Sequence, residues 1–145
     1  MTEKLKILFL CTGNSCRSQM AEAWTNKLKG DQFEAYSAGV APKPVDPRAV
    51  KAMGEAGIDI SGQKSKDIDS LADMEFDYVV TLCDNAKESC PFFPAGTRMM
   101  HRGFDDPPIL AQDAADEAEA MKHYRRVRDE IRAFVEKMPG ILEEG

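Results

Sequence analysis

The sequence lacks any run of apolar residues long enough to cross a membrane or to form the core of a signal peptide. The one apolar run near its start covers only residues 7–10, whereas a membrane helix needs about 20 apolar residues. Internal repeats and low-complexity segments are also missing. We therefore expect a cytoplasmic protein that has no membrane partner.

An excess of basic residues is missing as well. The formal net charge is −6, so the overall field repels nucleic acid and anionic lipid, and any anion site must be built locally. We expect no nucleic-acid partner. The 145 residues are 43% hydrophobic and 30% charged, which is typical of a globular protein with one core. We therefore expect a single domain over residues 1–145.

Cysteine is scarce, and its spacing is unlike that of a structural zinc site. The four cysteines form two pairs along the chain. Four residues lie between Cys11 and Cys16, and six lie between Cys83 and Cys90. Zinc knuckles use shorter paired spacings, so we expect no metal ion held by these thiols. Cytoplasmic thiols are kept reduced, which favours nucleophilic or redox roles over a disulfide framework.

Along the chain, segments whose apolar residues fit a buried strand alternate with segments whose apolar residues recur at helical spacing. We expect strands at residues 4–10, 33–38 and 76–82, with a weaker fourth at 97–101. We expect helices at residues 18–29, 46–56 and 113–138, and a loop with a short helix at 83–96. This order favours an α/β fold with an open, mostly parallel four-stranded sheet and helices on both faces. Ligands of such folds bind outside the carboxyl ends of the strands.

A small polar segment joins the first expected strand to the first expected helix. Backbone N–H groups and the helix dipole converge at such a junction, which suits an oxyanion. Gly13 and Asn14 tolerate the left-handed angles that turn successive N–H groups inward. The expected oxyanion-binding loop consists of Cys11, Thr12, Gly13, Asn14, Ser15, Cys16, Arg17 and Ser18.

Three side chains of this loop have expected roles in chemistry. Cys11 lies at its mouth, where the N–H groups and Arg17 favour a thiolate. Arg17 offers paired donors that match a tetrahedral oxyanion, and Ser18 is placed to donate a hydrogen bond to the thiolate. We expect Cys16 to be mainly structural, with a bond to Cys11 as a side reaction.

The order of one cysteine, five residues, an arginine and a serine resembles the loop of cysteine-dependent phosphatases. Its place near the start of the chain resembles the low-molecular-weight tyrosine phosphatases in particular. The resemblance implies their fold, with Cys11 as nucleophile. It also implies that Asp106, which precedes Pro107, is the general acid over the anion, because the leaving oxygen needs a proton. Taken alone, Asp105-Asp106-Pro107 is only a turn or helix-start signal.

A second thiol is expected beside the first. Cys83 follows the apolar residues 78–82 as Cys11 follows residues 7–10. If these strands are neighbours, about 4.8 Å apart, the two sulfurs come within disulfide reach after modest loop adjustment. Cys90 lies seven residues beyond Cys83 and can approach it in turn. Three thiols can therefore pass one disulfide outward.

The segments around Cys83, Cys90 and Asp106 resemble those of the thioredoxin-coupled arsenate reductases. The resemblance covers nearly the whole chain. The resemblance implies that Cys11 attacks arsenate, that Cys83 then attacks Cys11, and that Cys90 attacks Cys83. Thioredoxin is then the reductant, and no cofactor is tightly bound. The implied catalytic residues are Cys11, Cys83, Cys90, Arg17 and Asp106. A phosphatase, which needs no relay, and a catalytically inactive oxyanion sensor are the alternatives.

A potassium site is a further implication of this resemblance. Some relatives hold the ion with residues that correspond to Asn14, Glu22 and Ser37, together with a carboxylate near Ser65. In this sequence Lys66 aligns with that carboxylate, and its ammonium could replace the ion. The alternative, in which Asp67 supplies the carboxylate, remains open.

Overall fold

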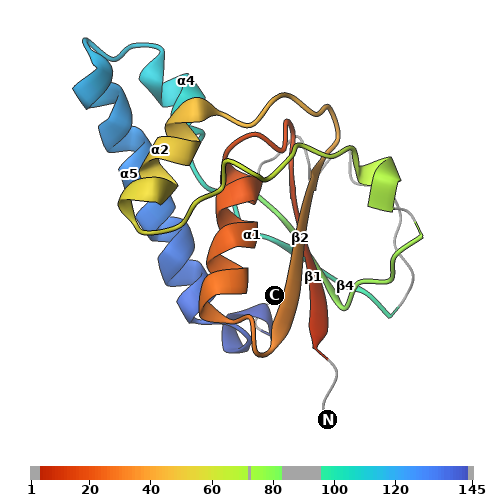
Figure 1. Cartoon of the computed structure of the whole chain (residues 1–145). Helices are drawn as coiled ribbons and strands as arrows, with labels where there is room; N and C mark the ends of the chain where they lie inside the picture. The colour runs from red at the N-terminus through yellow and green to blue at the C-terminus, as the bar shows by residue number, and fades with distance from the viewer. Residues whose placement is uncertain (1–3, 72, 83–95, 144–145) are drawn as a thin grey trace.

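Four parallel strands form the sheet of this protein, in the order β2-β1-β3-β4. The computed structural model describes residues 4–71, 73–82 and 96–143 (Figure 1). The strands are β1 (Leu5–Cys11), β2 (Phe33–Gly39), β3 (Tyr78–Thr81) and β4 (Arg98–His101). The helices are α1 (Arg17–Leu28), α2 (Pro47–Glu55), α4 (Pro107–Ala111) and α5 (Glu117–Glu136), with 3-10 helices η1 (Ile68–Leu71) and η2 (Gly140–Glu143).

The register brings the carboxyl ends of the two inner strands together. Cys11 pairs with Gly39 of β2, and Leu10 pairs with Thr81 of β3. The weak fourth strand is confirmed, because Thr81 also pairs with His101 of β4. Each of these pairings is parallel. The last residue of β1 therefore lies at the middle of the carboxyl edge, where the sequence predicts the ligand.

The two faces of β1 enter different cores. Ile7 and Phe9 pack with the buried faces of α1, α2 and α5, whereas Leu8 and Leu10 pack with Val79 on the opposite side. Ile68 and Leu71 of η1 cover this second core. Figure 1 accordingly shows α1, α2 and α5 on one side of the sheet and η1 on the other. Helical elements on both faces, as predicted, bury a strand that is apolar at successive positions.

A short helix precedes the last long helix, which the sequence analysis did not predict. The helix expected over 113–138 is α5, which is shorter by a few residues at each end, and α4 lies before it. Asp106 and Pro107 stand at the start of α4. The Asp116 carboxylate accepts a hydrogen bond from the Glu119 N–H and so caps the start of α5. This bond gives a partner to one of the backbone N–H groups that have none at the start of a helix.

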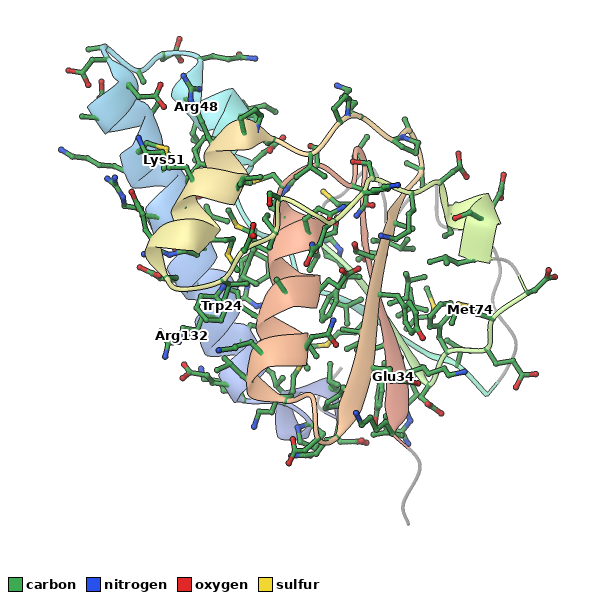
Figure 2. All side chains as sticks on the ribbon, viewed as in Figure 1. Trp24, Glu34, Arg48, Lys51, Met74 and Arg132 are labelled. Carbon is green, nitrogen blue, oxygen red and sulfur yellow. The ribbon has the colours of Figure 1, made fainter. Side chains whose placement is uncertain are left out.

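The apolar face of α5 lies where its periodicity predicts. Its buried residues include Tyr124, Val127, Ile131, Phe134 and Val135. At its outer edge, the Arg132 guanidinium lies 5.0 Å from the centre of the Trp24 ring on α1 (Figure 2). Within residues 4–71, 73–82 and 96–143, no helix combines the length and apolar character needed to cross a bilayer.

Candidate active site

The predicted anion loop connects the carboxyl end of β1 to the first turn of α1. Cys11 is the last residue of β1, and α1 begins at Arg17, one residue earlier than predicted. No side chain caps the start of α1 at Cys16. The N–H groups of its first turn are therefore directed toward the loop rather than toward a capping side chain.

The carbonyl groups of the loop are held on its outer side. The carbonyl oxygens of Thr12, Gly13 and Ser15 accept backbone hydrogen bonds of 2.8, 2.8 and 2.9 Å from residues 41, 43 and 46. In a trans peptide the N–H points opposite to the carbonyl. The N–H group that shares a peptide with each of these carbonyls consequently faces the other side of the loop. Successive inward N–H groups form an anion-binding nest.

Asn14 fixes the shape of the loop from within the protein. Its side chain is fully buried, donates to the Ser18 hydroxyl at 2.8 Å, and accepts from the Lys66 N–H at 2.8 Å. Its φ of 49° is left-handed, as predicted. Gly13, which also tolerates such angles, is not among the described residues with positive φ. Asn14 alone supplies the turn, because its side-chain bonds hold the strained backbone.

Two residues outside the predicted loop are needed for its shape. A Cβ atom on Gly39 would lie 2.7 Å from the Thr12 oxygen and 2.9 Å from the Asn14 nitrogen, so only glycine fits there. Gln19 is fully buried and donates to the Asn14 backbone oxygen at 2.9 Å. A polar residue on the buried face of α1 was the sequence signal for Gln19. The small residues that end β2 were the signal for Gly39.

Arg17 is held beside the loop by the segment that follows β4. One terminal nitrogen donates to the Phe104 carbonyl at 2.8 Å, and the other lies 3.4 Å from an Asp106 carboxylate oxygen. The Arg17 side chain is 9% exposed. Its Nε is buried and has no hydrogen-bond partner among the described residues. Nε and the nitrogen facing Asp106 can therefore bind two oxygens of an anion.

The two neighbouring aspartates have different surroundings. Asp106 approaches Arg17, and its carboxylate does not cap α4. Asp105 instead forms an exposed ion pair with Arg126 on α5, at 2.9 Å. Of the two carboxylates, Asp106 is therefore the one that lies beside the arginine of the loop.

Both cysteines of the loop are buried, and Cys16 is kept as a thiol. Cys11 is 4% exposed and Cys16 is 3% exposed. Burial raises the pKa of Cys16 well above its ordinary value, and the Asp46 and Asp106 carboxylates raise it further against the opposing effect of Arg17. A neutral Cys16 is consistent with the structural role that the sequence predicts for it.

The two relay cysteines, Cys83 and Cys90, lie outside the described residues. The chain is described as far as Leu82, whose N–H donates to the Leu10 carbonyl at 2.8 Å. β1 and β3 are hence neighbours, which was the condition for bringing a thiol after β3 close to Cys11.

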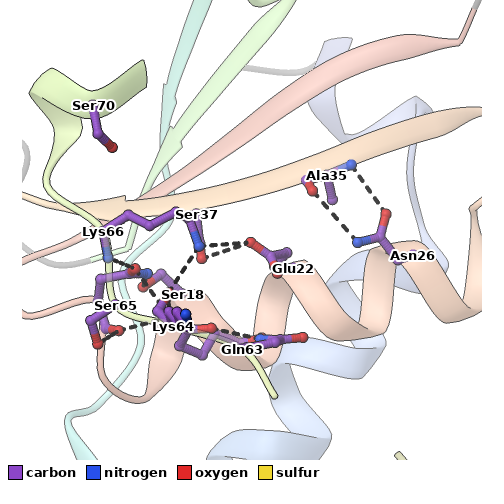
Figure 3. Close-up of polar contacts among 12 residues, drawn as sticks. Ser18, Glu22, Asn26, Ala35, Ser37, Gln63, Lys64, Ser65, Lys66 and Ser70 are labelled. Carbon is purple, nitrogen blue, oxygen red and sulfur yellow. Dashed lines mark hydrogen bonds and ion pairs between the residues drawn. The ribbon is translucent and has the colours of Figure 1, made fainter. Parts of the chain in front are cut away.

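The residues of the expected cation site lie together behind the loop. Ser37 donates to Glu22 at 2.9 Å, and the Lys66 ammonium lies 3.7 Å from the same carboxylate (Figure 3). Burial raises the pKa of Glu22, whereas Lys66 and then Ser37 oppose that rise. Asp67 accepts from the Asp69 N–H at the start of η1. In the described ranges, no group of three His, Cys, Asp or Glu side chains is placed to hold a metal ion.

Comparison with known proteins gives a family and several named relatives. The family model for low molecular weight phosphotyrosine protein phosphatase matches residues 6–144. An arsenate reductase of Halalkalibacterium halodurans is 52% identical over 88% of this chain and 90% of its own length. That of Bacillus subtilis is 51% identical over 86% and 88%. A solved arsenate reductase in the phosphate binding state is 28% identical, covers 97% of this chain and 98% of its own, and has a TM-score of 0.74.

Proposed function

Because this chain belongs to the low molecular weight phosphotyrosine protein phosphatase family, and relatives about half identical to it are arsenate reductases, we propose that it reduces arsenate to arsenite. The observation that carries the proposal is the hydrogen bond from the Leu82 N–H to the Leu10 carbonyl. It brings the chain that leads into Cys83 alongside the strand that ends at Cys11. A phosphatase has no use for a second thiol there.

The first step is an attack of the Cys11 thiolate on arsenic. The inward N–H groups of the loop, the Arg17 Nε and the Arg17 nitrogen that faces Asp106 hold the arsenate oxygens. Asp106 gives its proton to the departing oxygen, which leaves as water. The product is a covalent sulfur–arsenic(V) adduct on Cys11, and no electron has yet been transferred to arsenic.

Reduction follows when the Cys83 thiolate attacks the Cys11 sulfur. A Cys11–Cys83 disulfide forms, the sulfur–arsenic bond breaks, and its electron pair stays on arsenic, which departs as arsenite. Cys90 then attacks Cys83 and releases Cys11 as a thiolate. Thioredoxin reduces the remaining Cys83–Cys90 disulfide by thiol exchange and becomes oxidised itself. The reaction takes place in the cytoplasm, where that reductant and free thiols are maintained.

No potassium ion is required in this proposal. The Lys66 ammonium supplies the positive charge beside Glu22 and Ser37, as its 3.7 Å approach to Glu22 supports. Asp67 is engaged with the backbone of η1 instead. Hydrolysis of aryl phosphates remains a weak side activity, because it uses only Cys11, Arg17 and Asp106.

The test couples the purified protein to thioredoxin, thioredoxin reductase and NADPH. Arsenate should drive NADPH oxidation in the wild type. Cys11→Ser should abolish both arsenate reduction and aryl phosphate hydrolysis, because a serine hydroxyl stays protonated at neutral pH. Fast aryl phosphate hydrolysis without arsenate-dependent NADPH oxidation would show instead that the protein is a phosphatase.

A further inference from the structure

Tyr124 of α5 reaches the anion loop through one intermediate residue. Its hydroxyl donates to the Asp46 carboxylate, and the Asp46 backbone N–H donates to the Ser15 carbonyl at 2.9 Å. Tyr124 is 1% exposed, and Asp46 is half-buried at the start of α2. This connection joins the last long helix to the loop without touching the oxyanion.

Hydrogen bonds hold both the side chain and the backbone of Asp46 in position. One carboxylate oxygen accepts from the Arg48 N–H at 2.9 Å and so caps α2, while the other accepts from Tyr124. With its side chain held at both oxygens, its N–H keeps the Ser15 carbonyl turned outward. The Cys16 N–H of the same peptide then points into the loop.

We propose that Asp46, held by Tyr124, is a positioning residue of the anion loop: it orients the Ser15–Cys16 peptide toward the oxyanion and keeps Cys16 from competing with Cys11. The proposal rests on the loop's proposed role as the oxyanion site. It does not depend on whether the bound anion is later reduced.

The electrostatics of the connection agree with this role. Burial raises the pKa of Tyr124, and its hydrogen bond to Asp46 raises it further. The phenol therefore remains a donor throughout the working pH range. The charged groups that act on Cys16 are Asp46 and Asp106, which raise its pKa, and Arg17, which lowers it. Removing the Asp46 charge should make the Cys16 thiol easier to ionise.

Tyr124→Phe tests the positioning role, with Tyr78→Phe as a matched control. Tyr78 also donates its hydroxyl to a carboxylate, that of Glu143, but at the amino end of β3. Both variants lose one phenol–carboxylate bond. Tyr124→Phe should weaken the binding of inorganic phosphate, measured by calorimetry, roughly three- to tenfold, the scale of one typical intramolecular hydrogen bond. Tyr78→Phe should leave it unchanged.

A second variant tests the effect on Cys16. Asp46→Asn keeps the backbone N–H and an oxygen that can cap α2, but removes the charge. The Cys16 thiol, followed by the ¹³Cβ shift in NMR, should then ionise at lower pH than in the wild type. Unchanged phosphate binding in Tyr124→Phe, equal weakening in Tyr78→Phe, or unchanged Cys16 titration would each overturn the proposal. A wild type that binds phosphate but reduces no arsenate would contradict the proposed function alone.

Discussion

At the scale of single residues, the neighbouring Asp105 and Asp106 should respond very differently to the same substitution. Asp106→Asn should lower arsenite formation in a single turnover by roughly 10²–10⁴-fold, the usual loss when a general acid is removed. Phosphate binding should largely remain, because Arg17 and the loop N–H groups are intact. Rapid quenching with quantification of arsenite gives the rate.

The matched control for that change is Asp105→Asn. It loses only an exposed ion pair with Arg126, and such pairs contribute about 0–1 kcal/mol. Its arsenite formation should therefore match the wild type. If Asp105→Asn were the slow variant and Asp106→Asn the normal one, the general acid would be misassigned by one residue.

At the scale of elements, Glu22 of α1 accepts a hydrogen bond from Ser37 of β2 and lies 3.7 Å from the Lys66 ammonium. The pKa of Glu22 is raised in the folded state, so the folded protein holds this proton at pH values where the unfolded chain has lost it. Stability contributed by the site is therefore lost as pH rises from about 4.3 through that raised pKa. Lys66→Met removes the opposing charge and should extend this loss to higher pH.

Urea unfolding at pH 4.5 and pH 7.5 measures the effect. Lys66→Met should cost about 1–2 kcal/mol at pH 7.5, below the range for breaking a fully buried pair, and clearly less at pH 4.5. Lys64→Met is the control, since Lys64 is exposed. If Lys66 supplies the positive charge as proposed, replacing sodium by potassium should not stabilise the wild type. An equal loss at both pH values would contradict the role of Glu22.

The elements also show what sequence patterns can and cannot predict. β1 and α5 bury many apolar residues with a regular period, so both were predicted within a few residues. The five-residue helix α4 is too short to show a period, and the start of α5 depends on one capping bond at Asp116, which periodicity does not report. The anion loop was predicted from its own residues. Gly39 and Tyr124 lie 21 or more positions from the loop along the chain, and only the folded protein brings them near it.

At the scale of the whole molecule, all four strands contribute their carboxyl ends to the site. β1 ends at Cys11, and β2 ends at Gly39, which lets the loop approach closely. β3 leads through Leu82 toward Cys83, and β4 leads to the segment that carries Asp106. The parallel sheet thus brings the loop after Cys11, Asp106 and the residue that precedes Cys83 to one edge.

The proposed mechanism separates the anion chemistry from the relay, and Cys90→Ser tests the separation. In that mechanism Cys90 has no part in anion binding or in the first attack, so the variant should hydrolyse an aryl phosphate at nearly the wild-type rate. With arsenate, Cys11 and Cys83 can still react once. Arsenite should therefore appear as a burst of about one equivalent before turnover stops with a Cys11–Cys83 disulfide, which peptide mapping would detect.

Cys83→Ser is the companion variant, and it distinguishes the two halves of the relay. It should keep the aryl phosphate activity but give no arsenite burst, because no thiol remains to attack the Cys11 adduct. Thioredoxin cannot restart the stalled Cys90→Ser protein at the normal rate unless it reduces the Cys11–Cys83 bond directly. That bond joins a residue that is 4% exposed, where an attacking thiol has poor access. Sustained turnover of Cys90→Ser with thioredoxin would show that Cys90 is dispensable and that reduction occurs at the buried disulfide itself.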